Sequence, residues 1–175
     1  MRNTDAIPYL FYTFLLFAFV ASLFVVPFLE SNPSTSETGR ALFLIYRPMC
    51  HQLPSRSFFV FGKQMPVCSR DFGIYFGMLL GALAFPFISG IRSTKLLPVW
   101  ILIGSMVPIG IDGGVQLVSQ YTSIPFIGTY ESNNPLRLAT GLLIGMAMSF
   151  YAIPLLNGIW QGLEQDMEKG DRKER

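Results

Sequence analysis

The chain has 175 residues, of which 51% are hydrophobic and only 14% are charged, a balance typical of a polytopic membrane protein. Its formal net charge of +2 is small, and no run of lysines and arginines alternates with aromatic residues, so the composition excludes a nucleic-acid-binding protein. Long stretches without charge predict an all-α integral membrane protein, a bundle of four transmembrane helices in the lipid bilayer.

The predicted spans form one transmembrane domain over residues 1–163. We expect them at about residues 6–29, 72–91, 96–118 and 138–163, since each stretch supplies about 20 mostly apolar residues. The first run is too long for a typical signal peptide, so we interpret it as a helix that Pro27 closes near its far end. The charged tail at residues 164–175 is expected to be solvated and frayed.

The loop at residues 30–71, between the first two spans, is expected to carry a short interfacial helix. Residues 30–40 are polar and indicate a solvated loop. Residues 41–46 are apolar but too few to cross a bilayer, so they predict the interfacial helix, which ends at Pro48.

A small β-hairpin is predicted over residues 57–67 of the same loop. Gly62 and Lys63 would form its two-residue turn, with glycine first as a type II′ turn prefers. In that register Phe61 pairs with Gln64, and the base of the hairpin returns toward the start of the second span.

The loop also holds both cysteines and the only histidine. Cys50 and Cys68 have 17 residues between them, which is compatible with a disulfide, with a redox-active thiol pair, or with two ligands of a metal site. A zinc site would use Cys50, His51 and Cys68, with Asp71 as a fourth ligand. A lone histidine is more often structural, so His51 alone favours none of these.

Three arginines of the loop indicate a second kind of site. Arg47, Arg56 and Arg70 would converge near the start of the second span, an arrangement suited to the carboxylate or phosphate of a small anionic molecule or a lipid head group. The alternative is that these side chains only extend to the membrane interface.

Small residues recur at intervals of four in two of the predicted spans. One row is Gly73, Gly77 and Gly81, and the other, in the last span, includes Gly141 and Gly145. Such rows allow two helices to pack closely, so we expect the second and fourth spans to be in contact. A row of this kind can also join two copies of a chain into an oligomer.

The third span carries polar residues on one face, with Asp112 and Gln116 one turn apart. A buried acid needs a partner, and Arg137 at the start of the fourth span is the expected counter-ion. In the functional alternative, Asp112, Gln116, Glu131 and Arg137 line a polar cavity beneath the loop.

The distribution of lysine and arginine predicts the orientation. The termini and the turn at residues 92–95 hold their basic residues in short segments, whereas those of the opposite side are spread over long ones. We therefore expect a multi-pass protein of the cell membrane with both termini in the cytoplasm and the Cys/His loop outside.

Three segments resemble a known family. They are C-H-Q-L-P-S-R-S-F-F-V-F-G-K-Q-M-P-V-C-S-R-D-F-G-I-Y-F-G at residues 50–77, I-D-G-G-V-Q at 111–116 and E-S-N-N-P-L-R-L-A-T-G at 131–141. Together they are similar to a family of small, uncharacterised bacterial and archaeal membrane proteins known as a domain of unknown function. The family's pattern has a further cysteine where this chain has Asp71, and the resemblance implies a fold and a location but no activity.

These patterns give three hypotheses for function. The first is a membrane protein that binds or passes a small anionic or lipid-like ligand through a polar pocket at the outer face, under the Cys/His loop. The second is a metal- or thiol-dependent membrane enzyme that uses Cys50, His51 and Cys68. The third is a structural subunit of a larger membrane complex.

Overall fold

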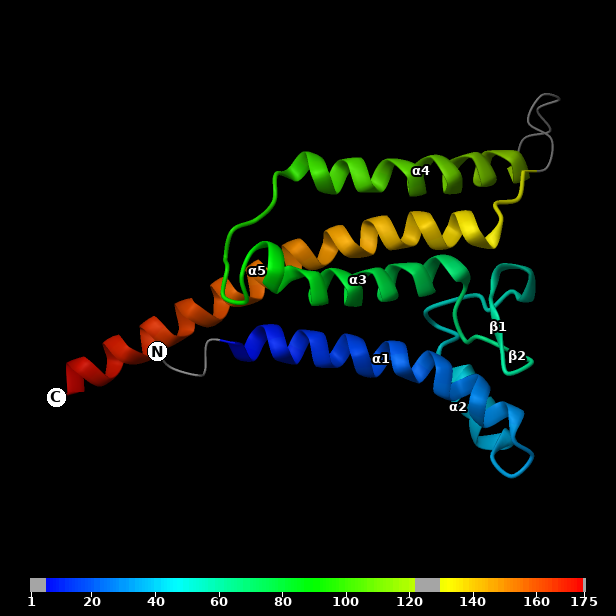
Figure 1. The fold of residues 1–175 in the computed structure, drawn as a ribbon, viewed down its shortest axis with the longest axis horizontal. Helices are drawn as coiled ribbons and strands as arrows, with labels where there is room; N and C mark the ends of the chain where they lie inside the picture. The colour runs from blue at the N-terminus through cyan, green and yellow to red at the C-terminus, as the bar shows by residue number, and fades with distance from the viewer. Residues whose placement is uncertain (1–5, 122–129, 175) are drawn as a thin grey trace.

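Four long helices make up most of the computed structural model, which describes residues 6–121 and 130–174. They are α1 (Ile7–Ser31), α3 (Ser69–Ile88), α4 (Val99–Tyr121) and α5 (Asn134–Glu174). Each is long and apolar enough to cross a membrane, and they lie side by side along one direction (Figure 1). The prediction of a four-helix integral membrane protein is therefore confirmed.

The closest packing in the bundle is between α3 and α5. A Cβ atom built on Gly73 would lie 2.6 Å from the carbonyl oxygen of Leu138, and one on Gly77 would lie 2.6 Å from that of Leu142. The two helix backbones are in direct contact, as the small-residue rows predict. Because these glycines are covered by α5 of the same chain, they are not an exposed surface for oligomer formation.

The first helix joins the bundle to the loop. Leu16 and Val20 of α1 pack in an apolar core with residues of α3 and α5. One turn further along, Leu23 is fully buried against Met65 and Val67 of the loop, in a second core that includes Cys50. The position of Cys50 is thus fixed by apolar packing against α1 as well as by its own backbone.

Two helix boundaries differ from the prediction. Pro27 is buried inside α1, which continues to Ser31, because a proline near a helix end removes only one backbone hydrogen bond. The last helix continues through the charged tail to Glu174. That segment is rich in good helix formers and has an ion pair between Lys169 and Asp166 at 3.7 Å, which favours helix over a frayed end.

The loop between α1 and α3 folds into small elements. They are α2 (Ser36–Ile45), a single 3₁₀ turn (Pro54–Arg56) and the antiparallel strands β1 (Phe59–Val60) and β2 (Lys63–Gln64). Both the interfacial helix and the hairpin are confirmed, although α2 begins inside the stretch that was predicted to be an irregular loop. It packs against α1, and this packing offsets the low apolar content of its first turn.

The predicted register of the hairpin is wrong. Phe59 pairs with Gln64, and Phe61 and Gly62 form the turn with φ of 55° and 72°. Two successive positive φ values define a type I′ turn, whose twist matches that of the strands. Phe61 tolerates this conformation while its ring contacts Phe28 of α1 edge-on at 5.6 Å.

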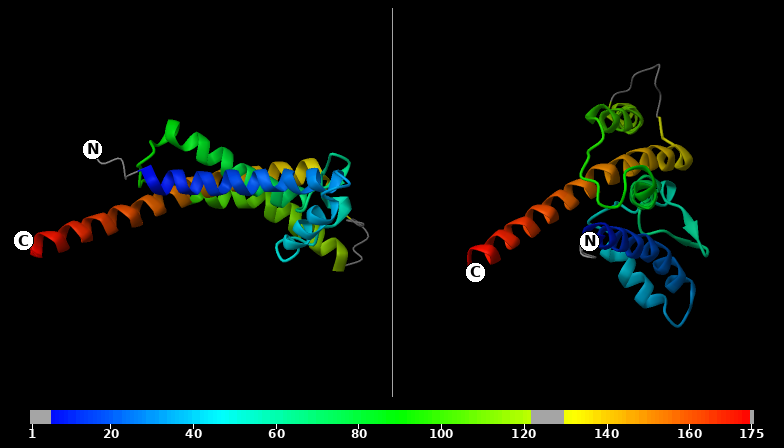
Figure 2. Two further views of the ribbon diagram at one scale, coloured as in Figure 1. Left: turned by 90° about the horizontal axis from the view of Figure 1, so that it is seen from below. Right: turned by 60° about the vertical axis from the view of Figure 1, so that its left-hand side comes forward.

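All of the loop elements lie at one end of the bundle (Figures 1 and 2). The same end holds the beginning of α3, the last turns of α4 and the beginning of α5. The start of α1 lies at the opposite end, and the charged part of α5 extends beyond the bundle there. Side chains from the loop and from three membrane helices can therefore meet at a single end.

Candidate functional site

A buried ion pair connects α3 to α4 at the loop end of the bundle. The guanidinium of Arg70, in the first turn of α3, is paired with Oδ2 of Asp112, whose side chain is only 4% exposed. The hydroxyl of Tyr130 donates to the other carboxylate oxygen of Asp112 at 2.9 Å. Asp112 thus has a cation on one oxygen and a hydroxyl donor on the other, as a buried acid requires.

The predicted ion pair between Asp112 and Arg137 is therefore wrong. Arg137 instead donates to Oδ1 of Asn134 at 3.3 Å, and its Nη2 lies 3.7 Å from Oε1 of Glu131. Both arginines lie at the loop end of the bundle, but Arg137 bonds to Asn134 at the start of its own helix. Arg70 points across to α4.

Glu131 links this helix start to the loop. Its Oε1 accepts a hydrogen bond from Nε of Arg56 at 3.3 Å, and the same oxygen is the one nearest to Arg137. The hydroxyl of Ser69 also donates to the backbone oxygen of Arg56 at 3.0 Å. Glu131 thus joins Arg56 and Arg137, and the pair of Arg70 with Asp112 lies at the same end of the bundle. We call these five residues, Arg56, Arg70, Arg137, Asp112 and Glu131, the charge cluster.

Several buried nitrogens in the cluster and on the neighbouring Gln116 have no hydrogen-bond partner among the described residues. Nε of Arg70, Nε2 of Gln116 and Nη2 of Arg137 are buried and have no hydrogen-bond partner within the described residues. Asp112 already uses both of its oxygens, and one oxygen of Glu131 serves two arginines. Buried donors in proteins are normally paired, so these three nitrogens are available to an added acceptor.

A pocket of about 370 Å³ opens beside the cluster. It is lined by Met49, Cys50, His51, Gln52, Leu53, Arg56, Cys68, Arg70 and Asp71. The structure thus brings together six of the residues that the sequence singled out. Arg47 is not among them, because it lies on the exposed side of the turn that follows α2, and the third arginine of the cluster is Arg137 instead.

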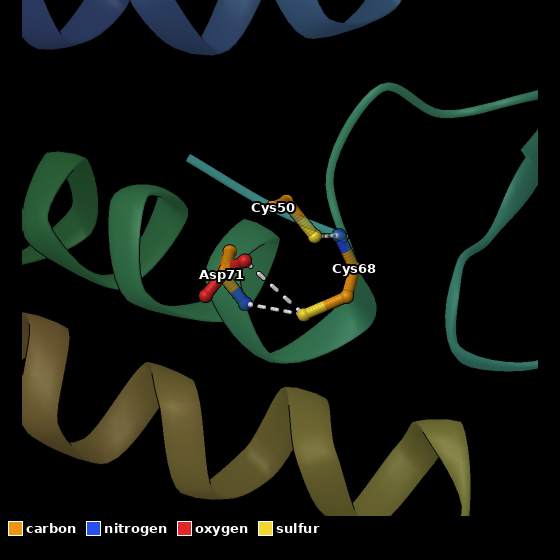
Figure 3. Close-up of side chains that lie close together, drawn as sticks. All are labelled: Cys50, Cys68 and Asp71. Carbon is orange, nitrogen blue, oxygen red and sulfur yellow. Dashed lines mark hydrogen bonds between the residues drawn. The ribbon is translucent and has the colours of Figure 1, made fainter. Parts of the chain in front are cut away.

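The two thiols and Asp71 meet at the wall of this pocket (Figure 3). The backbone N–H of Cys68 donates to Sγ of Cys50 at 3.1 Å, and that of Asp71 donates to Sγ of Cys68 at 3.5 Å. Sγ of Cys68 lies 3.3 Å from Oδ2 of Asp71. One ligand atom from each residue lies within 4.8 Å of the other two, and both thiols are free.

His51 does not join this group. It is exposed and lines the pocket, whereas the cluster of possible metal ligands consists of Cys50, Cys68 and Asp71 alone among the described residues. The predicted metal set stays a prediction, of which the structure brings Cys50, Cys68 and Asp71 together without His51. Neighbouring residues on an irregular backbone point in different directions, which separates the imidazole from the thiol next to it.

Hydrogen bonding gives the thiols of Cys50 and Cys68 different pKa values. Contact with the side chain of Cys68, together with the backbone N–H groups of Gln52 and Cys68, holds the pKa of the Cys50 thiol below its usual range. The same contact with Cys50, together with burial, raises the pKa of Cys68. Without a bound ligand, Cys50 is therefore the thiol that ionises first.

Two residues of the site were missed in the sequence. Gln52 has a positive φ of 52°, and its Nε2 donates to the backbone oxygens of Phe43 at 2.6 Å and Pro66 at 3.1 Å. It therefore ties α2 to the end of the hairpin. Tyr130 stands next to a predicted site residue, and its donation to Asp112 raises the pKa of its phenol. No sequence pattern distinguishes Gln52 from an ordinary loop glutamine.

Comparison with known proteins agrees with the membrane fold. A family described as "Predicted membrane protein (DUF2085)" matches residues 50–151. An uncharacterised protein of Methanocaldococcus jannaschii is 38% identical over 141 residues, which cover 78% of this chain and 85% of that protein. Another, of Methanothermobacter thermautotrophicus, is 36% identical over 104 residues, which cover 59% of this chain and 84% of that protein. No solved structure matches the chain.

Proposed function

Since this chain belongs to the DUF2085 family of membrane proteins, whose description states no activity, we propose a function from the site itself: the protein binds a small anion at the loop end of its bundle. The anion carries a carboxylate or phosphate group, either free in water or as the head group of a lipid. The binding groups are Arg56 and Arg70, which line the pocket, and Arg137 behind them.

The surplus of buried donors carries this proposal. Carboxylate and phosphate oxygens accept several hydrogen bonds and donate none when ionised, so they match three unpaired donors on Arg70, Gln116 and Arg137. Arginine is the cation best suited to them, because its planar guanidinium presents two parallel N–H groups.

The net charge of the cluster also favours an anion. The cluster has three guanidinium groups and two carboxylates, Asp112 and Glu131, which leaves one positive charge at the end of a membrane bundle. Asp71 also lines the pocket, and its carboxylate offsets part of this positive charge there. A charge of this kind at the membrane boundary attracts anionic head groups as well as dissolved anions.

We place this end of the bundle outside the cytoplasm, on the basis of the basic residues in the short segments at the other end. A green fluorescent protein fused after the C-terminus should fluoresce, because it folds in the cytoplasm and not after export. A dark fusion together with an active periplasmic reporter at the same position would reverse the orientation.

Anion binding can be measured by thermal unfolding of the full chain in detergent, with inorganic phosphate against sodium chloride at equal ionic strength. A ligand at 100 times its dissociation constant stabilises the folded state by about 2.7 kcal/mol. We expect phosphate to raise the unfolding temperature, and Arg137→Gln to remove most of that rise. Arg47→Gln is the matched control, because Arg47 lies in the same loop but outside the pocket.

The lipid source is tested in nanodiscs. If the natural ligand is a head group, phosphatidylglycerol should stabilise the protein relative to phosphatidylcholine, and Arg137→Gln should reduce the difference. The double variant Arg70→Gln/Asp112→Asn removes the ion pair without leaving a buried charge, so it tests Arg70 in a folded protein. No rise with either phosphate or phosphatidylglycerol would refute the proposal.

A further inference from the structure

We propose that Cys50, Cys68 and Asp71 form a binding site for a thiophilic divalent metal ion, of which zinc is the natural example. This site is separate from the donor surplus of the arginine cluster and does not depend on the proposed anion. The metal site and the anion site have only the pocket in common.

The distances fit a tetrahedral metal centre. Zinc lies about 2.3 Å from thiolate sulfur and about 2.0 Å from carboxylate oxygen, so a tetrahedron has edges of roughly 3.5 Å between sulfur and oxygen and 3.8 Å between two sulfurs. Sγ of Cys68 is already 3.3 Å from Oδ2 of Asp71, and all three ligand atoms lie within 4.8 Å of one another. Shifts of about an ångström or less in the side chains complete the geometry.

The ligands come from two segments that the fold holds rigidly. Cys68 caps α3 and Asp71 is in its first turn, so two residues separate them, a spacing common among zinc ligands. Cys50 arrives from the segment after α2, where Leu23, Met65 and Val67 bury it. The arrangement in Figure 3 is therefore fixed by a helix start on one side and an apolar core on the other.

Ordinary helix capping explains only part of this arrangement. A side chain at the N-cap commonly accepts the N–H of the third residue, as Sγ of Cys68 does from Asp71. Capping does not require a second thiol, yet Sγ of Cys50 accepts the N–H of Cys68 from across the loop. Each sulfur thus receives a backbone N–H, the outer-sphere support that stabilises metal-bound thiolates.

The charges balance when a metal binds. Each cysteine releases its thiol proton to water and donates a sulfur lone pair to the metal, so two protons leave as one dication enters. Two thiolates and one carboxylate sum to three negative charges, and the dication leaves one. Arg56 and Arg70 line the same pocket, so two positive charges lie near this residual negative charge. Three protein ligands leave the fourth position of the metal for water, the ligand count of catalytic zinc sites.

The test uses Zn²⁺ and Co²⁺ with the full chain, purified in detergent under reducing conditions. We expect one equivalent of Zn²⁺ per chain, and release of protons on binding. With Co²⁺ we expect the near-ultraviolet charge-transfer absorption that thiolate ligands produce. Cys50→Ser and Cys68→Ser should abolish that absorption, and Asp71→Asn should weaken binding by at least about tenfold, since even outer-sphere partners are worth 10–100-fold.

Two controls separate this site from its alternatives. His51→Ala should keep the metal, because the imidazole is outside the ligand cluster. Asp166→Asn should also keep it, because this variant removes an exposed carboxylate of α5 that is not part of the cluster. If a cysteine variant does not fold, the Co²⁺ spectrum and proton release of the wild-type chain decide the question.

Three results would overturn the proposal. One is a reduced wild-type chain with two titratable thiols and no bound metal. Another is metal that remains bound after both cysteines are replaced. The third is a chain isolated with no free thiols that takes up no metal after reduction, which would assign Cys50 and Cys68 to a disulfide.

Discussion

The contact between α3 and α5 gives a prediction that can be worked out from the coordinates. Gly77→Ala places a methyl group 2.6 Å from the carbonyl oxygen of Leu142 and 2.9 Å from its Cα. Both atoms belong to the backbone of α5, so no side-chain rotation can make room. An ordinary contact begins at 3.4 Å, and the helices must therefore separate by about 0.8 Å at this point.

The loss of stability expected for Gly77→Ala follows from the way membrane helices attract each other. Lipid removes the hydrophobic drive between helices, so close van der Waals packing holds them together. A gap of 0.5–1 Å forfeits a quarter to a half of that attraction for the atoms on either side. We therefore expect Gly77→Ala to lower the free energy of unfolding by about 1–3 kcal/mol, the usual range for an overpacked core.

The measurement is reversible unfolding of the purified chain in mixed micelles by a denaturing detergent. Gly158→Ala is the matched control, because it is also a helix glycine but has no atom within 4 Å of the added methyl group. It should be neutral or should stabilise the protein by up to about 1 kcal/mol, since alanine favours helix over glycine. Equal unfolding free energies for the two variants would show that α3 and α5 are not in backbone contact.

Three further predictions concern the loop end of the bundle. In a double-mutant cycle, Arg70→Gln should cost about 3–5 kcal/mol because it leaves Asp112 buried and unpaired, and Asp112→Asn should recover most of that loss. The same cycle with Arg137 should be additive within about 0.5 kcal/mol, and strong coupling there would restore Arg137 as the counter-ion. In the metal-free chain, Cys50 should react with a small alkylating reagent at a lower pH than a free cysteine does, because the pKa of its thiol is lowered. Mass spectrometry across a pH series measures the rate, and a rate that rises only above the usual thiol range would contradict the lowered pKa. Gln52→Ala should speed proteolysis of the loop, since it removes two hydrogen bonds worth about 1 kcal/mol each, and an unchanged cleavage rate would contradict that role.

The membrane fold could be predicted from the sequence because its signals are local. A gap in the charges of sufficient length indicates a span wherever it occurs, and a row such as Gly73, Gly77 and Gly81 lies on one helix face by geometry alone. Neither inference requires knowledge of the neighbouring helix. The last span continues its row through Gly141, Gly145 and Ser149, whereas the third span has only the pair Gly110 and Gly114 at this spacing, so the pairing of the two longer rows could be anticipated.

The counter-ion could not be assigned in the same way. A sequence gives the depth of Asp112 in the membrane, and both Arg70 and Arg137 are near that depth. It does not give the direction in which each helix turns its side chains, and this direction selects Arg70. The same limit applies to His51, which stands next to Cys50 in the sequence but outside the group of ligand atoms.

The hairpin register was missed for a different reason. Glycine normally takes the first position with positive φ, yet Phe61 takes it here and Gly62 follows. The preference of a single residue type is weaker than the match between turn twist and strand twist. The aromatic contact of Phe61 with Phe28, which is far away in the sequence, further stabilises this turn.

The ion pair of Arg70 has a mechanical consequence for α4. This helix buries few of its residues in the bundle and packs mainly on α5, so the pair with Asp112 acts as a latch that holds its last turns to the start of α3. The latch can be released without disturbing the glycine contacts between α3 and α5. Loss of this ion pair would loosen the last turns of α4 from α3, while the packing of α4 on α5 and of α3 on α5 would remain.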